Sequence, residues 1–197
     1  MEEKIVYFDE GGKRNTDETL RLALERAQAR GINKIVLAST VGDTARLAAQ
    51  RFAGSGIKLV VVPHQHGFRQ AGQRFSVELV KELESQGHSV HFGTMLFHTD
   101  ELYGTPTPQV MATLLRTFCQ GMKVCVEIIL MATDGGHVLP GEMVIAVAGT
   151  GRGSDTAVVA VAASSRFLSD LHLTEIICKP LQTKSWPLAS PPVARNL

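Results

Sequence analysis

The sequence predicts an α/β fold, a three-layer α/β/α sandwich built around a mostly parallel β-sheet. Short runs of apolar and β-branched residues alternate along the chain with longer segments in which apolar residues recur every three or four positions. The runs are about five residues long, which is typical of parallel strands covered by helices on both faces. The chain has 197 residues, of which 44% are hydrophobic and 20% charged, so its composition is that of a globular protein.

The first predicted strand covers residues 4–8, and a loop with the pair Gly11-Gly12 follows it. Asn15 and Glu18 have the spacing of a helix N-cap and the glutamate that bonds back to it, so a helix should begin there. This helix should end at Gly31, because glycine readily adopts the left-handed conformation that closes many helices.

Two buried strands, Lys34–Ala38 and Lys58–Val62, come next. The apolar spacing over residues 45–52 predicts a helix between them, which Gly54-Ser55-Gly56 terminates. A long polar loop follows over residues 63–74, and loops of this length in compact domains are usually functional or mobile.

The next predicted elements are a helix over residues 76–86, a short strand over 88–92 and a helix that ends near Gly121. The last of these helices should have Thr107 as its cap and Pro108 as its first residue. Its apolar residues share one face that should turn to the core: Met111, Leu114, Leu115 and Phe118.

Residues 123–134 are ambiguous, because their valines and isoleucines favour a strand whereas their length and the Gly135-Gly136 stop favour a helix. We predict a helix. Strands should follow over residues 142–148, 157–162 and 175–178.

The composition changes at Pro180. Residues 180–197 contain four of the eight prolines, the single tryptophan Trp186 and no acidic residue. We therefore predict one α/β domain over residues 1–179 and a proline-rich C-terminal arm over residues 180–197. Two interpretations of the arm remain open: it packs on its own domain, or it forms a subunit interface in a homo-oligomer.

The charge balance argues against nucleic acid as a partner, because 20 lysines and arginines face 19 aspartates and glutamates and no block of like charge occurs. The apolar runs are far shorter than the roughly 20 residues that span a bilayer, and the start, Met1-Glu2-Glu3-Lys4, lacks a signal-peptide pattern. We therefore expect a cytoplasmic protein without a membrane partner. Cys119, Cys125 and Cys178 form no metal-binding motif and should be reduced core thiols.

The first candidate site is the turn between the second predicted strand and the following helix. It consists of Ser39, Thr40, Val41, Gly42, Asp43 and Thr44. A glycine lets the backbone approach an anion closely, hydroxyls donate hydrogen bonds, and free N–H groups at a helix N-terminus favour negative charge. The turn therefore predicts a phosphate site, although the same residue types are also common where helices begin.

The second candidate is a glycine-rich turn between two predicted strands. Its candidate binding residues are Gly149, Thr150, Gly151, Arg152, Gly153 and Thr156. It lacks the third glycine of a dinucleotide fingerprint, so it is either an anion-holding turn or a plain hairpin. Because the strands ending at Ala38 and Ala148 should be parallel, we expect Arg152 to face the same cleft as residues 39–44.

The long loop supplies His64, Gly67 and Phe68, which are free to contact a ligand. No carboxylate or cysteine joins His64 and His66 of this loop, so we expect no metal. Glu127 lies among apolar residues and is either an acid–base group with a raised pKa or a paired core carboxylate. No serine, cysteine or zinc-protease catalytic motif is present, so catalytic residues stay unassigned.

Two segments resemble the C-terminal α/β domain of pyruvate kinase. The first reads Ile-Val-Leu-Ala-Ser-Thr-Val-Gly-Asp-Thr-Ala over residues 35–45, and the second reads Pro-Gly-Glu-Met-Val-Ile-Ala-Val-Ala-Gly-Thr-Gly-Arg-Gly-Ser-Asp-Thr-Ala-Val over residues 140–158. In that family both loops hold phosphates of a sugar bisphosphate effector. The resemblance implies the same role for Ser39, Thr40, Gly42 and Thr44 and for residues 151–153.

The likeness spans about residues 34–162 and has limits. The catalytic barrel is missing from these 197 residues, so no pyruvate kinase activity is expected. As a whole, including Lys123-Val-Cys-Val-Glu-Ile and Glu175-Ile-Ile-Cys-Lys-Pro, the chain is similar to stand-alone prokaryotic proteins that contain this domain and have no assigned activity.

The turn Ser-Thr-Val-Gly-Asp-Thr also resembles the flavodoxin phosphate loop, Thr/Ser-x-Thr-Gly-x-Thr, with Val41 replacing the usual hydroxyl residue. That resemblance implies flavin mononucleotide (FMN) as a cofactor and a redox enzyme of unknown substrate. Asp43 and the lack of a lysine or arginine in the turn favour a ligand with one phosphate. The alternative is a non-catalytic module that senses a sugar phosphate or a nucleotide.

Overall fold

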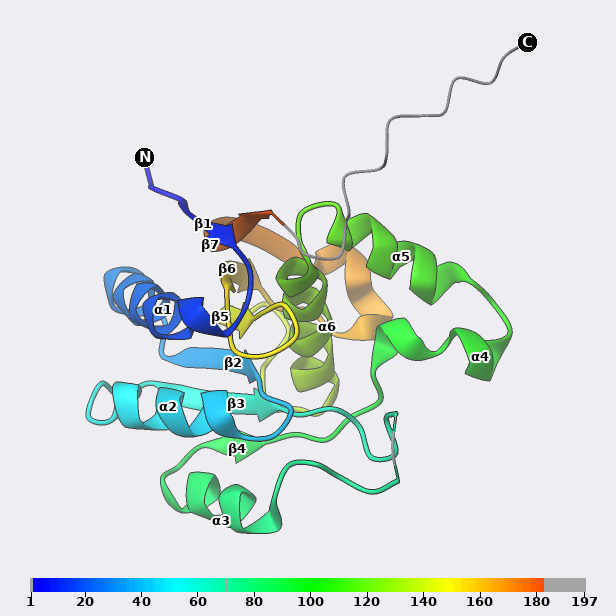
Figure 1. Ribbon diagram of the computed structural model, residues 1–197, viewed down its shortest axis with the longest axis horizontal. Helices are drawn as coiled ribbons and strands as arrows, with labels where there is room; N and C mark the ends of the chain where they lie inside the picture. Colours follow the sequence, from blue (N-terminus) through cyan, green and yellow to red (C-terminus); the bar gives the residue numbers. More distant parts are fainter. Residues whose placement is uncertain (1, 70, 183–197) are drawn as a thin grey trace.

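The fold is built on a seven-stranded sheet with the order β1-β7-β6-β5-β2-β3-β4 (Figure 1). The computed structural model describes residues 2–69 and 71–182. Its strands are β1 (Val6–Glu10), β2 (Lys34–Ala38), β3 (Lys58–Val62), β4 (Ser89–Val90), β5 (Met143–Ala148), β6 (Thr156–Val161) and β7 (His172–Gln182). Among the described strands only β6 runs antiparallel to its neighbours, so the predicted mostly parallel sheet is confirmed.

Helices cover both faces of the sheet, which confirms the three-layer architecture (Figure 1). One layer contains α1 (Thr16–Arg30), α2 (Asp43–Phe52) and α3 (Val77–Ser85). On the other face α6 (Gln120–Asp134) lies against the sheet, with α5 (Thr107–Arg116) and the short α4 (Asp100–Tyr103) outside it. Single-turn 3₁₀ segments occur at Lys13–Asn15 and Leu96–His98, and a longer one at Ser165–Asp170.

Alternating side chains of the central strands build two separate cores. Ile35 and Leu37 of β2 belong to the cluster beneath α1, α2 and α3, whereas Val36 belongs to the cluster beneath α6. Both kinds of residue are buried, because the strand is covered on its two faces. This double burial explains why β2 and β3 read as unbroken apolar runs and why their predicted bounds match the structure.

The ambiguous segment over residues 123–134 is helical, as predicted, and α6 is the most buried of the described helices. It packs between the sheet and α5, so nearly every side requires apolar residues. The β-branched residues that made the segment look like a strand are therefore a consequence of burial on all sides. Gly121 allows the close approach, because a Cβ there would lie 2.1 Å from Thr156 Oγ1.

The predicted starts of two helices need correction. Asn15 does not cap α1 through its side chain, because its amide donates to Glu10 O at 2.7 Å and a 3₁₀ turn precedes the helix. Glu18 instead pairs with Arg21. The helix α5 begins at Thr107 with Pro106 as its N-cap, so Pro108 is its second residue and not its first.

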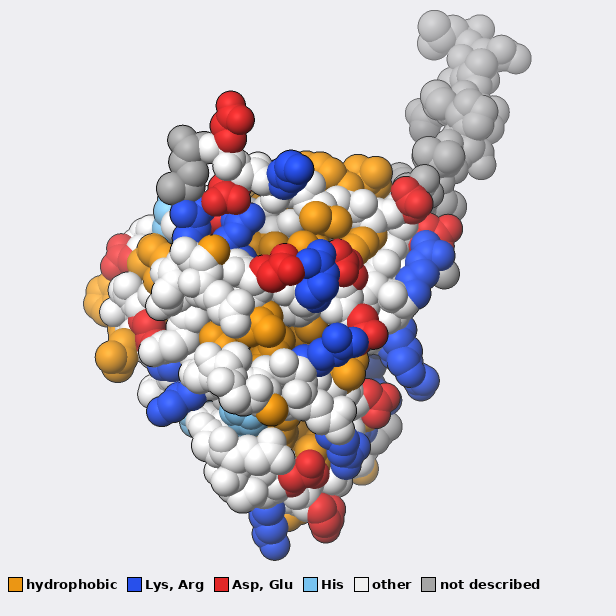
Figure 2. Space-filling view, turned by 90° about the vertical axis from the view of Figure 1, so that its left-hand side faces the viewer, with side chains coloured by type: hydrophobic (Ala, Val, Ile, Leu, Met, Phe, Trp, Pro, Cys, Tyr) orange, Lys and Arg blue, Asp and Glu red, His pale blue; other side chains and the backbone are white. Residues whose placement is uncertain are grey.

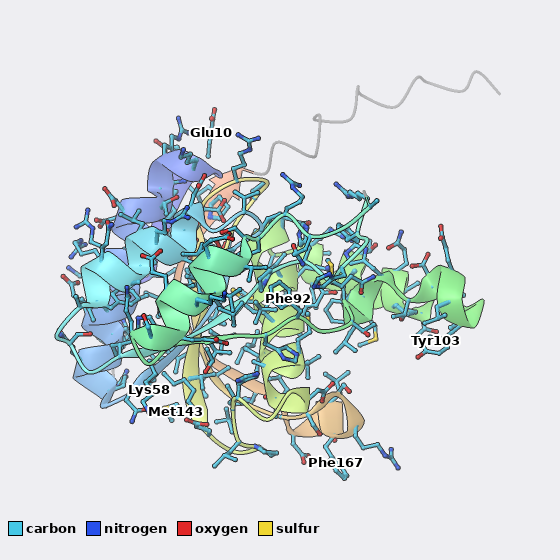
Figure 3. The ribbon with its side chains drawn as sticks, turned by 90° about the horizontal axis from the view of Figure 1, so that it is seen from below. Glu10, Lys58, Phe92, Tyr103, Met143 and Phe167 are labelled. Atoms are coloured by element: carbon cyan, nitrogen blue, oxygen red, sulfur yellow. The ribbon has the colours of Figure 1, made fainter. Side chains whose placement is uncertain are left out.

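The predicted core face of α5 is wrong in part. Met111 and Leu115 pack on a small cluster with α6, but Leu114 is 66% exposed and Phe118 is 52% exposed. The reason is that α5 lies outside α6 and not on the sheet, so only a narrow stripe is covered. Figure 3 shows this region, with Tyr103 of α4 far from the α1–α3 layer.

The strands at the edge differ from prediction. β1 begins two residues later than predicted, and the predicted strand over 175–178 is the middle of an eleven-residue strand, β7. The strand pattern of β7 is weak in the sequence because β7 pairs with the edge strand β1 and keeps polar residues on its less covered side. β7 continues through Pro180 to Gln182, so the predicted arm begins inside the sheet, and residues 183–197 lie outside the described residues.

Ion pairs line the outer surface of α1. Arg21 bridges Glu18 and Glu25, and Arg26 and Glu3 pair beside them. Figure 2 shows acidic and basic side chains beside one another on this side of the molecule. The charges on this surface are therefore largely neutralised locally.

The parallel arrangement of β2, β3 and β5 brings their carboxyl ends to one edge. Ala38 lies beside Val62, and Leu37 lies beside Val147. The loops that follow these three strands therefore meet, which is where open α/β sheets bind ligands.

Ile145 on β5 tests how strongly the central sheet contributes to stability. Its side chain is fully buried in the α1–α3 cluster, so Ile145→Ala should lower the free energy of unfolding by about 2–5 kcal/mol. Met143→Ala on the same strand is the control, because Met143 is exposed and should cost about 0.5 kcal/mol or less. Urea unfolding of both variants measures the difference, and equal losses would contradict this account.

Candidate functional site

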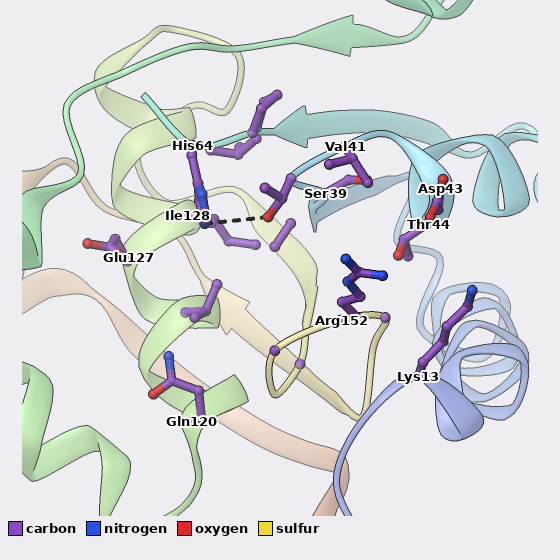
Figure 4. A pocket seen from close by; sticks show the side chains of 18 of the residues that line it. Lys13, Ser39, Val41, Asp43, Thr44, His64, Gln120, Glu127, Ile128 and Arg152 are labelled. Carbon is purple, nitrogen blue, oxygen red and sulfur yellow. Dashed lines mark hydrogen bonds between the residues drawn. The ribbon is translucent and has the colours of Figure 1, made fainter. Parts of the chain in front are cut away.

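A cavity of about 710 Å³ opens at the carboxyl edge of the sheet (Figure 4). The loops after β1, β2 and β3, the turn between β5 and β6, and one side of α6 from Gln120 to Met131 form its walls. The predicted site residues that line it are Ser39, Thr40, Val41, Asp43, Thr44, His64, Phe68, Glu127, Gly149, Gly151, Arg152 and Gly153. Both glycine-containing turns therefore face one cavity, and Arg152 lies beside Thr44 as expected (Figure 4).

The turn between β2 and α2 leaves donors free at the helix start. Ser39 Oγ accepts a hydrogen bond from Ala45 N at 3.3 Å, so this hydroxyl supports the helix end. The N–H groups of Asp43 and Thr44, the first two of α2, have no hydrogen-bond partner among the described residues. Free N–H groups at a helix N-terminus favour an anion.

Gly42 is required for the shape of this turn. Its φ is +99°, a left-handed conformation that other residues rarely adopt, and a Cβ there would lie 2.1 Å from Leu79 Cδ2. Gly42 itself does not line the cavity. Gly42 therefore has a packing role beneath the turn, and its role in close approach to a phosphate stays a prediction.

The turn over residues 149–155 is held from below by Asp155, whose side chain is fully buried. Asp155 Oδ2 accepts hydrogen bonds from Gly12 N at 2.7 Å and from Thr150 N at 2.9 Å, and Oδ1 accepts from Thr156 Oγ1 at 2.8 Å. One carboxylate thus joins the loop after β1 to the turn after β5. Thr150 and Thr156 serve this support and do not line the cavity.

Helix α1 fixes the other side of the same turn. Thr16 Oγ1 accepts from Ser154 N at 3.0 Å and donates to Lys13 O at 2.7 Å. Gly153 lies so close that a Cβ would meet Thr16 Oγ1 at 2.3 Å. These contacts place Lys13 and Arg152 at the rim of the same cavity (Figure 4).

Basic residues outnumber acidic ones around the cavity. Seven lysine and arginine side chains line it, against three carboxylates, although the whole chain has a net charge of only +1. The basic residues are Lys13, Arg14, Arg69, Arg74, Arg116, Lys123 and Arg152, and the acidic ones are Asp17, Asp43 and Glu127. Such a distribution attracts anions.

The cavity also contains a buried ion pair on α6. Lys123 is 1% exposed and Glu127 is 2% exposed, and the Lys123 ammonium donates to Glu127 Oε2 one helical turn away. Glu127 Oε1 accepts from Phe97 N at 2.8 Å. Of the two interpretations given to Glu127, the structure shows the paired carboxylate.

His98 extends this pair toward the long loop. Lys123 Nζ lies 3.1 Å from His98 Nε2, and because an ammonium can only donate, Nε2 accepts. Burial, and then the neighbouring Lys123, lower the pKa of His98 below its ordinary value of 6.5. Burial also lowers the pKa of Lys123, although Glu127 opposes that shift.

Aromatic rings connect His98 to the turn over residues 39–44. The Phe68 ring lies 5.1 Å from the His98 ring and 4.8 Å from the His64 ring, both edge-on. His64 Nε2 in turn lies 3.4 Å from Thr40 Oγ1 (dashed in Figure 4). Burial, and then Arg74, lower the pKa of His64.

Several cavity residues were missed in the sequence. Lys13 and Arg14 follow the Gly11-Gly12 loop, and Lys123 lies four residues before Glu127 on a predicted helix. This four-residue spacing on a helix is a recognisable ion-pair pattern, so Lys123 could have been predicted as the partner of Glu127. No local pattern identifies Arg116 or His98, because only the packing of α5 and of the segment before α4 against α6 brings them to this edge. Gly67 was predicted to contact a ligand but does not line the cavity.

Within residues 2–69 and 71–182, no group of three or more histidine, cysteine, aspartate or glutamate side chains has an arrangement that could hold a metal ion. Among the helices of the same residues, none has the length and apolarity needed to cross a membrane.

Comparison with known proteins identifies related domains. A family model described as the α/β domain of pyruvate kinase matches residues 17–161, which confirms the resemblance seen in the sequence. Among solved structures, a pyruvate kinase from Cryptosporidium parvum is 14% identical, with a TM-score of 0.42, over 75% of this chain and 23% of that chain. A Cryptosporidium parvum pyruvate kinase in complex with ADP is 16% identical, with a TM-score of 0.39, over 73% of this chain and 22% of that chain. The match thus covers less than a quarter of these enzymes.

Asp155 offers a test of how the glycine-rich turn is held. Asp155→Ala leaves the N–H groups of Gly12 and Thr150 without their acceptor, so it should lower the free energy of unfolding by at least about 2 kcal/mol. Asp170→Ala removes an exposed carboxylate and should change it by about 0.5 kcal/mol or less. Chemical denaturation of both variants measures this, and a neutral Asp155→Ala would show that the carboxylate does not hold the turn.

The two cavity histidines predict a pH dependence of stability. Because the pKa values of His64 and His98 are lowered in the folded protein, the unfolded chain binds more protons than the folded protein just below pH 6.5. Stability should therefore be greater above pH 6.5 and fall as the pH drops below it. Urea midpoints between pH 7.5 and pH 5.5 measure the slope, which should flatten in a His64→Gln/His98→Gln variant but not in His66→Gln, an exposed histidine. An unchanged slope in the double variant would refute this origin.

Proposed function

The chain belongs to the pyruvate kinase α/β domain family, and we propose that in this member the cavity binds a phosphate-bearing small ligand, specifically FMN. One observation carries the proposal. The same cavity contains a helix N-terminus with free N–H groups and, at its rim, basic side chains without ion-pair partners among the described residues. The opposite wall of the same cavity includes aromatic and aliphatic side chains. A ligand with an anionic end and a flat apolar end matches both walls.

The phosphate end of the proposed site is the start of α2. The N–H groups of Asp43 and Thr44 and the hydroxyl of Thr44 are the donors, and Arg152 and Lys13 supply positive charge from across the cavity. Neither Arg152 nor Lys13 has an ion-pair partner among the described residues. Charge-assisted hydrogen bonds of this kind are stronger than neutral ones.

The ring end of the proposed site is the wall formed by the long loop and α6. Phe68 and His64 offer aromatic surfaces, and Val124, Ile128 and Met131 provide an aliphatic one. The backbone of the 149–153 turn offers hydrogen-bonding groups for polar atoms at a ring edge. Bound FMN would supply hydride-transfer chemistry, which makes a redox enzyme of unknown substrate the specific form of this proposal.

The number of basic residues favours a second candidate function. The turn over residues 39–44 has no basic residue, which favoured one phosphate, but the fold adds Arg74, Arg14 and Arg116 to the cavity wall. A cavity with this charge also suits a sugar phosphate or a nucleotide. In that case the protein would be a sensing module without catalysis.

Flavin titrations test the proposed function. Protein freed of bound small molecules by unfolding and refolding should bind FMN and quench its fluorescence, whereas riboflavin, which lacks the phosphate, should bind at least tenfold more weakly. Equal affinity for both flavins, or none for either, would refute FMN as the ligand. Binding of sugar phosphates without binding of FMN would support the sensing module.

Thr44 provides the sharpest variant for the phosphate end. Thr44→Ala removes a hydroxyl at the helix start and should weaken FMN binding by roughly 1.5–3 kcal/mol, the scale of a hydrogen bond to a charged group. Thr44→Ser keeps the hydroxyl and should retain most of the affinity. Calorimetry with FMN measures both variants, and an unchanged affinity of Thr44→Ala would remove this turn from the site.

A further inference from the structure

The proposed FMN site leaves one charged cluster of the cavity unused. This cluster consists of Arg116 at the end of α5, Lys123 on α6 and His98 in the segment before α4. In Figure 4, Arg152, Lys13 and Thr44 lie at one side of the cavity, and Gln120 and Glu127 lie on α6 at the other side. Arg116 bonds to Gln120, and Lys123 bonds to Glu127, so the cluster lies on the α6 side.

We infer that this cluster is a second anion subsite, which binds the carboxylate of a substrate molecule lying beside the phosphate-bearing ligand. The inference rests on the proposed function for the identity of that neighbouring ligand. FMN carries one phosphate, and its ring carries no second anionic group, so it would satisfy the α2 end and leave the basic residues on the α6 side without an anion.

Arg116 has guanidinium N–H groups that no described residue accepts from. Arg116 Nε donates to Gln120 Oε1 at 2.8 Å, and no carboxylate pairs with Arg116 among the residues that the structure describes. Lys123 donates to Glu127 and to His98, so one of its three N–H bonds has no oxygen or nitrogen acceptor in the described chain. These donors come from adjoining ends of α5 and α6.

The charge of the cluster favours a carboxylate over a second phosphate. Glu127 already neutralises Lys123, so Arg116 supplies the net positive charge, with Arg69 facing His98 from the long loop. A singly charged anion matches this balance better than a doubly charged one. The planar guanidinium of arginine also fits a carboxylate with two parallel hydrogen bonds.

The surroundings fit a flat or apolar body behind that carboxylate. Phe68 lies 5.1 Å from His98, and Met95 and Val124 line the neighbouring wall. A carboxylic acid with a small apolar body would therefore place its charge at Arg116 and its body against the same wall as the proposed flavin ring. The substrate class is a small, mostly apolar carboxylic acid.

Benzoate and its neutral counterpart benzamide are suitable probes. Benzoate should bind the FMN-loaded protein with saturation and perturb the flavin absorption spectrum, while benzamide should bind at least tenfold more weakly. Equal binding of the two probes would overturn the subsite, because charge would then play no part. Displacement of FMN by benzoate would also overturn it, because the two anions would share one site.

Two variants locate the bound benzoate. Arg116→Gln, and a Lys123→Met/Glu127→Gln double variant, should each weaken benzoate binding tenfold or more. The double change avoids an unpaired buried carboxylate and keeps an acceptor for Phe97 N. Arg166→Gln is the matched control, since Arg166 is exposed on the Ser165–Asp170 segment outside the cavity and should have no effect.

The same variants distinguish failure of this inference from failure of the proposed function. Calorimetry with benzoate on protein without flavin tests the subsite even if FMN does not bind. Benzoate affinity that is lost in Arg116→Gln supports the subsite whatever the flavin result. Benzoate affinity that falls in Thr44→Ala but not in Arg116→Gln would place benzoate at the start of α2 and overturn the second subsite.

Discussion

Asp155 joins segments that are far apart in the chain, and the shape of the cavity depends on it. Its fully buried carboxylate accepts from the loop after β1, from the turn after β5 and from the first residue of β6. A buried carboxylate without such donors would be strongly destabilising, so the donors and the charge depend on one another. These bonds hold the backbone that carries Arg152 and the loop before Lys13, and both side chains lie across the cavity from the start of α2 (Figure 4).

The opposite wall, at the start of α2, is fixed in a different way. Gly42 has no room for a side chain beneath Leu79, which fixes the turn before α2 and leaves the first N–H groups of that helix open to the cavity. One wall is thus fixed by a buried charge and the other by close packing. A ligand between two such fixed walls meets donors that need little reorganisation, which favours binding.

The sequence predicts those parts of the fold in which local pattern and burial agree. The strands β2 and β3 are recovered because burial on both faces gives continuous apolar runs, and the helix α6 is recovered from its length and its glycine stop although its β-branched residues suggest a strand. The exposed face of α5 could not be foreseen, because its periodicity is that of a core helix although only a stripe of it is covered. The two glycine-containing turns were located from their residue types, whereas Arg116 and His98 reach the cavity only through the tertiary arrangement of α5, α6 and the segment before α4.

The buried pair of Lys123 and Glu127 is difficult to explain by stability alone. Removing two charges from water costs several kcal/mol for each ion, roughly, and apolar residues of similar volume often fill such positions at no loss of stability. α6 is otherwise apolar on this side, so an apolar pair would fit its surroundings. The charges instead lie where the helix meets the cavity, in contact with His98 and close to Arg116. Their position at the cavity agrees with the binding role proposed for Lys123 beside Arg116.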